Sequence, residues 1–216
     1  GWIDDPSNDN SKYERVRVRQ ALNDTHSAPK SGNSAQRAEL SRNAVELLRG
    51  SVSVFHSVLA KIDLAAANPE TPEFRHGLSA LLAVLGGRSY FPAATGMDRA
   101  MAFLASGTSA RMTLGRVLLD RRRDGLYLFR ERRNLPEIAI ESGESGIWDD
   151  RFVIENHSSM AIRVMPSFWG EEGLSMFPNV PAGVARQAMA AMPHVVAVDS
   201  EAILGSEPVV VTLRLA

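Results

Sequence analysis

The sequence predicts an α+β fold, in which a helical first domain with a basic β-hairpin precedes a small mixed α/β C-terminal domain. Apolar residues recur every three or four positions through much of the first half, as in amphipathic helices. After about residue 110 they gather in short runs with strand character. With 44% hydrophobic residues, the chain can bury a sizeable core. We expect three segments, at 1–30, 31–134 and 135–216.

The segment 1–30 is predicted to open with a polar turn. In the stretch DDPSNDN, the proline fixes one φ angle. The side chains of Asp5, Ser7 and Asn8 can hydrogen-bond to the neighbouring backbone, which favours a turn.

A short helix is expected to begin near Ser11, because Glu14 stands three positions later as a capping-box partner. Arg15, Arg17 and Arg19 lie on this helix, and their spacings of two and four spread them over more than one face. On physical grounds alone, a solvated helix surface explains these arginines as well as a binding role does.

Three further helices are predicted in the first half. A long amphipathic helix is expected over 34–66, with a possible kink at Gly50. A second helix over 72–87 begins with a proline and ends in a glycine pair. A third, over 96–107, also ends in glycine.

The pattern then changes to strands. Two strand-like runs within 111–133 flank Asp124-Gly125, a dipeptide that strongly favours a hairpin turn. The remaining expected elements are strands at 146–156 and 161–166, a helix at 181–193, and strands at 194–198 and 208–215.

The predicted hairpin carries a cluster of arginines. A two-residue turn at the Asp-Gly pair places Arg121 and Arg123 on one face at the tip, with Arg130 and Arg132 further along that face and Arg122 opposite. Such a cationic face suits phosphate binding. The alternative is an exposed hairpin that its charges keep soluble.

Charge is unevenly distributed, although the net charge is only −1. Residues 108–140 hold 8 Lys/Arg against 4 Asp/Glu, whereas residues 141–216 hold 4 against 10. A basic segment therefore precedes an acidic one, and the basic segment contains the hairpin.

Several classes of function find no support in the residues. Cysteine is absent and the five histidines are scattered, so no metal site is predicted. No nucleophile elbow, Walker loop or dinucleotide fingerprint occurs, which leaves a stand-alone hydrolase without a nucleophile. The absence of cysteine and of a long apolar stretch favours a cytoplasmic protein without a membrane partner.

The opening stretch, DDPSNDNSKYERVRVR, resembles the segment that closes the ATP-binding domain of tRNA(Ile)-lysidine synthetases. In that family a D-x-S-N turn precedes an arginine-rich helix. Asp5, Ser7 and Asn8 match the turn, and Val16 stands where the family usually has Asn. The matching arginines are Arg15, Arg17 and Arg19.

Later stretches resemble the same family in the same order. The similarity to its helical substrate-binding domain and basic hairpin is carried by LSALLAVLGGRSYFP, MDRAMAFLASG and TLGRVLLDRRRDGLYLFRERRNLP. The similarity to its C-terminal domain is carried by IWDDRF, ARQAMAAMP and the final strand.

The resemblance implies a function. The family joins lysine to the 2-position of the wobble cytidine of a CAU-anticodon tRNA(Ile), using ATP and Mg²⁺. Its S-G-G-x-D-S phosphate loop does not occur in this sequence. We therefore expect the chain to comprise the tail of the catalytic PP-loop domain (1–30), the tRNA-binding domain (31–134) and the C-terminal domain (135–216).

The same resemblance implies roles for particular residues. Asp5, Ser7 and Asn8 are expected at the margin of the active site, and no catalytic residue is expected in this chain. The residues expected to bind tRNA are Arg15, Arg17, Arg19, Arg121, Arg123, Arg130 and Arg132. By itself the chain is expected to bind no cofactor and to be inactive.

A different class of function remains open on the residues alone. The chain could be a non-enzymatic protein-interaction module, with helices 34–66 and 71–87 as its docking surface and no nucleic acid involved. The near-neutral net charge fits that interpretation equally well. The residues also leave open whether the chain forms a homodimer.

Overall fold

A computed structural model describes residues 31–167, 170–198 and 209–214. These residues form α+β structure with three antiparallel sheets. Gly1–Arg42 and Asn43–Ala216 are separate compact units. Six candidate site residues lie outside the described ranges, as does the helix expected from near Ser11: Asp5, Ser7, Asn8, Arg15, Arg17 and Arg19.

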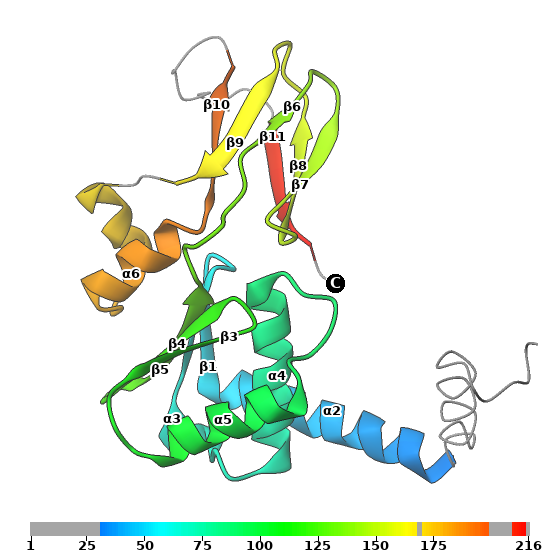
Figure 1. Ribbon diagram of the computed structural model, residues 1–216, viewed down its shortest axis with the longest axis vertical. Coiled ribbons are helices and arrows are strands. Elements are labelled where there is room, and N and C mark those ends of the chain that lie inside the picture. The colour runs from blue at the N-terminus through cyan, green and yellow to red at the C-terminus, as the bar shows by residue number, and fades with distance from the viewer. Residues whose placement is uncertain (1–30, 168–169, 199–208, 215–216) are drawn as a thin grey trace, which may run out of the picture. The chain divides into compact units, whose positions relative to one another are not determined.

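Most helices of the described chain lie in its first half and most strands in its second half (Figure 1). The helices are α2 (Ser31–Ser51), α3 (Leu64–Ala67), α4 (Pro72–Gly86), α5 (Ala94–Ala105), the 3-10 helix η2 (Glu171–Met176) and α6 (Ala182–Met189). The strands are β1 (Val52–Phe55), β2 (Leu59–Ile62), β3 (Arg111–Leu114), β4 (Val117–Arg122), β5 (Gly125–Arg130), β6 (Ile138–Ile140), β7 (Ser145–Trp148), β8 (Phe152–Asn156), β9 (Ile162–Pro166), β10 (Pro193–Ala197) and β11 (Val209–Leu213).

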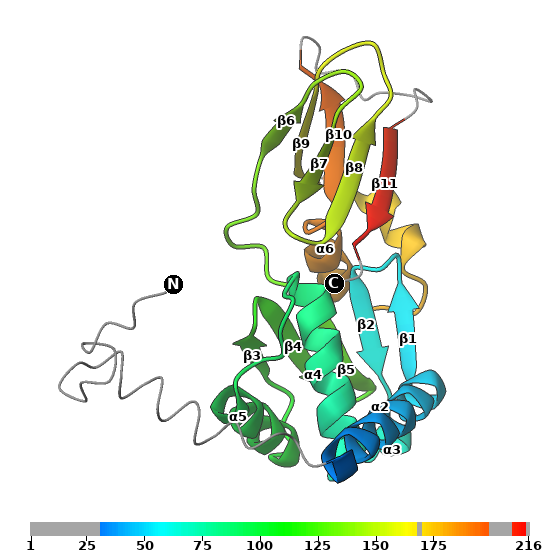
Figure 2. The same ribbon diagram turned by 90° about the vertical axis from the view of Figure 1, so that its right-hand side faces the viewer.

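A five-stranded sheet with the order β1-β2-β5-β4-β3 separates two hydrophobic cores. Successive side chains of a strand point to opposite faces. Leu126 and Leu128 therefore join the core formed with α4 and α5, which cover this face in Figure 2. Tyr127 and Phe129 join the second core, formed with the C-terminal part. All six residues of β5 are buried, because this strand is central and covered on both faces.

The predictions for α4 and α5 are confirmed. Thr71 caps α4 by accepting a hydrogen bond from the Phe74 amide, and Pro72 occupies the first turn, where its missing N–H is not needed. Gly87 ends the helix with a φ of +62°, a left-handed conformation that favours glycine.

The prediction of one helix over 34–66 is wrong beyond Ser51. The chain instead forms the β1–β2 hairpin and the short helix α3. Its turn lies at His56 and Ser57, which both have positive φ, and the Val58 amide bonds to the Phe55 carbonyl. Apolar residues spaced three and four apart lie in strands here, because β2 pairs with β5. The helical spacing misled the prediction, since β5 lies more than sixty positions away in the sequence and no local pattern reveals the pairing.

The hairpin predicted within 111–133 is present as β4 and β5, but its expected register is wrong. Arg122 pairs with Gly125, so Arg123 and Asp124 form the turn, one position earlier than expected. Gly125 lies inside the sheet, where a Cβ atom would come within 2.6 Å of the Ile62 carbonyl oxygen. Close approach of the neighbouring strand β2 therefore accounts for this glycine.

In the C-terminal part, β9, α6, β10 and β11 lie where a strand, a helix and two strands were predicted, but the strand expected at 146–156 is divided into β7 and β8, and β6 and η2 were not predicted. The strands build two small sheets, β10-β9-β6 and β11-β8-β7. Trp148, Ile154 and Val164 of these sheets share one core with Val184 of α6. Tyr127 of the large sheet reaches the same core, which joins the C-terminal part to the hairpin.

Candidate nucleic-acid interface

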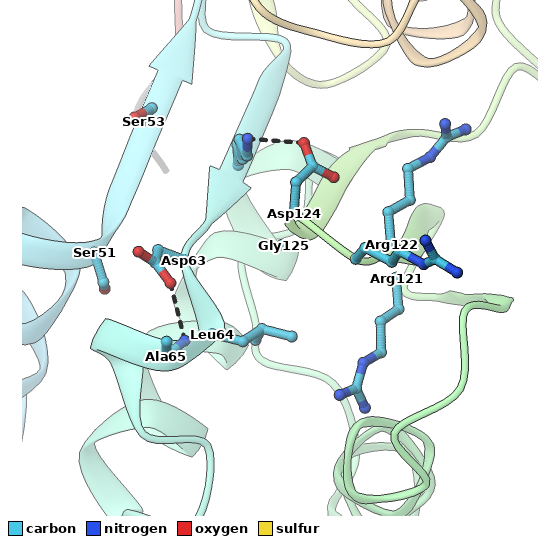
Figure 3. A pocket seen from close by; sticks show the side chains of 11 residues that line it. Ser51, Ser53, Asp63, Leu64, Ala65, Arg121, Arg122, Asp124 and Gly125 are labelled. Atoms are coloured by element: carbon cyan, nitrogen blue, oxygen red, sulfur yellow. Dashed lines mark hydrogen bonds and ion pairs between the residues drawn. The ribbon is translucent and has the colours of Figure 1, made fainter.

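The tip of the β4–β5 hairpin borders a pocket of about 470 Å³. Figure 3 shows the hairpin tip on one side, with β1 and β2 on the other and the start of α3 between them. The lining residues are Ser51, Ser53, Lys61, Asp63, Leu64, Ala65, Arg121, Arg122, Arg123, Asp124 and Gly125. Three consecutive arginines thus share one pocket.

The first two arginines leave β4 in opposite directions, as Figure 3 shows. Arg121 donates to the carbonyl oxygen of Leu104 at the end of α5. Arg122 donates through Nε and Nη2 to Oδ2 of Asp120, at 3.1 and 3.0 Å. The expected contrast between Arg121 and Arg122 is therefore confirmed, since they point to opposite faces.

Arg123 differs from both because it is exposed in the turn. No hydrogen bond or ion pair holds its guanidinium to any residue that the structure describes. A turn residue belongs to neither strand, so the expected sharing of a strand face with Arg121 does not hold.

Asp124 is held at the tip by two donors. Its Oδ2 accepts hydrogen bonds from Lys61 Nζ at 3.0 Å and from the hydroxyl of Tyr127. The bond from Tyr127 is the main cause that lowers the pKa of Asp124, and the bond to Asp124 raises the pKa of Lys61. Burial raises the pKa of Tyr127, so at neutral pH its hydroxyl keeps the proton that it donates.

The tip carries an excess of positive charge. Its five cations are Lys61, Arg111, Arg121, Arg122 and Arg123, and its three carboxylates are Asp63, Asp120 and Asp124. Asp120 is buried between Arg111 at 2.9 Å and Arg122 at 3.0 Å, and Asp63 accepts the Ala65 amide at the start of α3. Five against three leaves a surplus of two positive charges, which favours an anionic ligand.

Arg130 lies in a different environment from the one predicted. Its side chain is 2% exposed, and it donates from Nε and Nη2 to the two oxygens of Asp149, each at 3.0 Å. The register explains the error, because Arg130 pairs with Val117 near the buried end of the sheet, away from the tip. Arg132, also predicted for this face, is exposed in the loop after β5.

Asp149 accepts from two further arginines. Arg151 Nε lies 2.7 Å from its Oδ2, and Arg116 bonds to its Oδ1. Burial lowers the pKa of Arg151 to about 10, although Asp149 opposes the shift. The Arg151 guanidinium is therefore still charged at neutral pH. This cluster joins the large sheet to the β7–β8 hairpin and is internal, so we assign it to stability.

Sequence reasoning missed Lys61, Ser51 and Ser53 as neighbours of the hairpin tip. The pairing of β2 with β5 brings them there. A signal was present in the alternating Val and Ser residues of SVSV, which favour a strand over a helix.

Within 31–167, 170–198 and 209–214, no group of three His, Asp or Glu side chains could hold a metal ion. No helix in those ranges is long and apolar enough to cross a membrane.

The chain is similar to several curated proteins described as tRNA(Ile)-lysidine synthase. That of Rhizobium meliloti (strain 1021) is 36% identical over 211 residues, which cover 95% of this chain and 46% of the relative. That of Bartonella quintana (strain Toulouse) is 32% identical over 82% of this chain and 39% of its own length. That of Mesorhizobium japonicum is 30% identical over 89% of this chain and 44% of its own length.

No model of a protein family matches the chain, and no solved structure matches it. The chain spans less than half the length of these relatives. The matched region nevertheless covers most of this chain in each case. The chain is therefore homologous, over most of its length, to a portion of the tRNA(Ile)-lysidine synthases.

Proposed function

We propose that this chain is the tRNA-binding portion of a tRNA(Ile)-lysidine synthase. On the family's chemistry, the complete enzyme is an ATP-dependent ligase that joins lysine to C2 of the wobble cytidine of CAU-anticodon tRNA(Ile) in the cytoplasm. Its ATP, Mg²⁺ and lysine sites belong to the part of the synthases that this chain does not match. By itself this chain binds tRNA and does not catalyse the ligation.

The observation that carries the proposal is the guanidinium of Arg123, which lines a cationic pocket and has no partner among the described residues. A guanidinium presents several N–H donors in a plane and binds phosphate oxygens in pairs. Arg121 and Arg122 flank it with their positions fixed by Leu104 and Asp120. Ser51 and Ser53, on the opposite wall, supply hydroxyl groups that can also donate to phosphate.

Such a clamp acts by positioning. Phosphate contacts fix the register and orientation of an RNA without reading its sequence. Correct placement of reactants can lower a reaction barrier by about 7–11 kcal/mol. The hairpin tip is carried by β5, which is central in the sheet and buried along its length. Arg15, Arg17 and Arg19, which match the family's arginine-rich helix, are assigned to the same task by that resemblance.

A groove favours the alternative, a protein-docking role. It has a volume of about 730 Å³ and lies between the start of α4 and the end of α5. Its lining includes Pro69, Pro72, Met101 and Leu104, and only two charged residues, Glu70 and Arg75. The groove is mainly apolar, so it suits a protein segment better than an RNA backbone.

A filter-binding titration separates the two functions. The chain is titrated against CAU-anticodon tRNA(Ile), an unrelated tRNA, and a DNA duplex, at two salt concentrations. The proposal predicts tRNA binding that weakens steeply with salt, because released counterions drive phosphate contacts. No tRNA binding at low salt would reject the proposal and leave protein docking.

A further inference from the structure

The loop between α4 and α5 exposes two consecutive aromatic side chains. Tyr90 is 64% exposed and Phe91 is 48% exposed. Phe91 is anchored by an edge contact with His76, at 5.3 Å between ring centroids. Tyr90 has no aromatic neighbour among the described residues, which leaves its ring available. Figure 1 shows this loop leaving α4 on the side where β11 ends.

Two hollows meet at Tyr90. One, of about 260 Å³, is also lined by Arg88, Arg99 and Pro92. The other, of about 220 Å³, is also lined by Arg88 and by Arg214, which follows β11. Tyr90 and Arg88 belong to both hollows, so an aromatic ring stands between two cavities that each contain two arginines.

These arginines are not neutralised by the carboxylates nearby. Within the parts of the chain that the structure describes, no ion pair engages Arg88, Arg99 or Arg214. Asp150 lines the second hollow, but its Oδ2 lies 3.1 Å from Arg116 Nη1. Asp98, next to Arg99 on α5, is paired with Arg75 of α4, with 2.8 Å between Oδ1 and Nη2. The surroundings of Tyr90 are therefore cationic.

We infer that this loop binds an unstacked nucleotide of an RNA, with the base on Tyr90 and the flanking phosphates on Arg88 and on Arg99 or Arg214. Single-stranded RNA is bound by this combination of an exposed aromatic platform and adjacent cations, because every base has a π-face and every nucleotide a phosphate. The inference rests on the proposed function, that the chain meets an RNA. It uses residues separate from the hairpin tip.

The test compares single-stranded with fully paired RNA. The whole chain is titrated with a labelled oligoribonucleotide of about ten residues, and with the same strand in a blunt duplex. Stacking on an aromatic side chain contributes enough that its loss weakens binding by about 5-fold to 100-fold. Tyr90→Ala should lose affinity for the single strand in that range and keep its affinity for the duplex within about twofold. Tyr90→Phe should bind like the wild type, because phenylalanine keeps the π-face.

A spectroscopic signal separates stacking from a structural effect. With 2-aminopurine in the oligoribonucleotide, base stacking quenches fluorescence at saturation, and Tyr90→Ala should abolish the part of the quenching that stacking causes. Arg88→Ala should retain the quenching but reduce the log–log salt slope by about 0.7, as expected for one phosphate contact on a single strand. Tyr90 is exposed and Arg88 is half-buried, and circular dichroism should show unchanged folding for both variants.

The outcomes distinguish this inference from the proposed function. If the chain binds tRNA, and Tyr90→Ala matches the wild type on the single strand or weakens both RNAs equally, the nucleotide site is wrong and the proposed function stands. If the wild-type chain binds neither tRNA nor the oligoribonucleotide at low salt, both are wrong. Selective loss on the single strand with loss of quenching supports the site.

Discussion

Arg130 and Asp149 form a buried bidentate ion pair, with Nε–Oδ2 and Nη2–Oδ1 distances of 3.0 Å and side chains that are 2% and 0% exposed. The pair connects the central strand β5 to the turn between β7 and β8. Arg151 and Arg116 share the same carboxylate. Asp149 therefore contacts three guanidiniums at the junction between the large sheet and the C-terminal part, and it is the carboxylate that Arg130 and Arg151 share.

Removing that carboxylate charge should strongly destabilise the protein. Asp149→Asn leaves two fully buried guanidiniums, Arg130 and Arg151, without their counter-ion, and loss of one partner from a buried pair costs about 3–5 kcal/mol. The free energy of unfolding in urea measures this. Asp150→Asn is the matched control, because its side chain is 61% exposed and should cost less than about 1 kcal/mol. Equal effects of the two variants would contradict this account of the cluster.

The glycine in β5 should tolerate no side chain. Gly125 has a φ of +139°, and a Cβ atom would approach the Ile62 carbonyl oxygen to 2.6 Å. Gly125→Ala should therefore cost more than about 1 kcal/mol of unfolding free energy. In α6, Gly183 has no atom near the position of a Cβ, so Gly183→Ala should leave stability unchanged or raise it by up to about 1 kcal/mol. Thermal and urea unfolding of both variants checks the contrast.

The hydrogen bonds to Asp124 should make a small contribution to stability that depends on pH. Its folded pKa lies below the usual 3.8, so the stabilisation is complete above that value and disappears as the pH falls through the folded pKa. The site is half exposed, so Asp124→Asn should cost less than about 1 kcal/mol at neutral pH. In urea unfolding series, the difference from wild type should shrink between about pH 5 and pH 2.

The control for this series is Glu144→Gln, an exposed carboxylate without a side-chain partner among the described residues. Its stability difference from wild type should stay near zero at every pH. A deficit of Asp124→Asn that persists unchanged at about pH 2 would show that the carboxylate charge is not what Lys61 and Tyr127 stabilise.

Local sequence signals predicted the elements whose ends are chemically marked. α4 has a capping threonine, a proline in its first turn and a terminal glycine, and its bounds matched closely. The helix α6 was likewise found in its expected place, whereas the strand expected at 146–156 is two strands, β7 and β8, joined by a turn. Both helices can be recognised from their own residues.

Elements and roles that depend on distant partners were missed. β1 and β2 are strands because β5 pairs with β2, and their turn at His56 and Ser57 lacks the usual Asn-Gly signal. The predicted hairpin register was off by one residue because Gly125 was assigned to the turn. The glycine is instead required by the close approach of β2. No local pattern shows that Arg130 would meet a buried aspartate nineteen positions later.

The central claim is that the hairpin tip binds the phosphates of tRNA. The three arginines at the tip should contribute unequally, because Arg121 and Arg122 already bond to the protein, whereas Arg123 bonds to no residue that the structure describes. Arg123→Ala should therefore weaken binding most, and to all tRNAs about equally, since phosphate contacts carry no sequence information.

The most direct measurement is the salt dependence of tRNA(Ile) binding by the wild type, Arg123→Ala and Arg186→Ala. Arg186 is the matched control, an exposed arginine on α6 that pairs with Glu171. Our account predicts that Arg123→Ala reduces the log–log salt slope by about 1, and that Arg186→Ala leaves the slope and affinity unchanged. Wild-type slope and affinity in Arg123→Ala would contradict it and show that the hairpin tip is only a solvated turn.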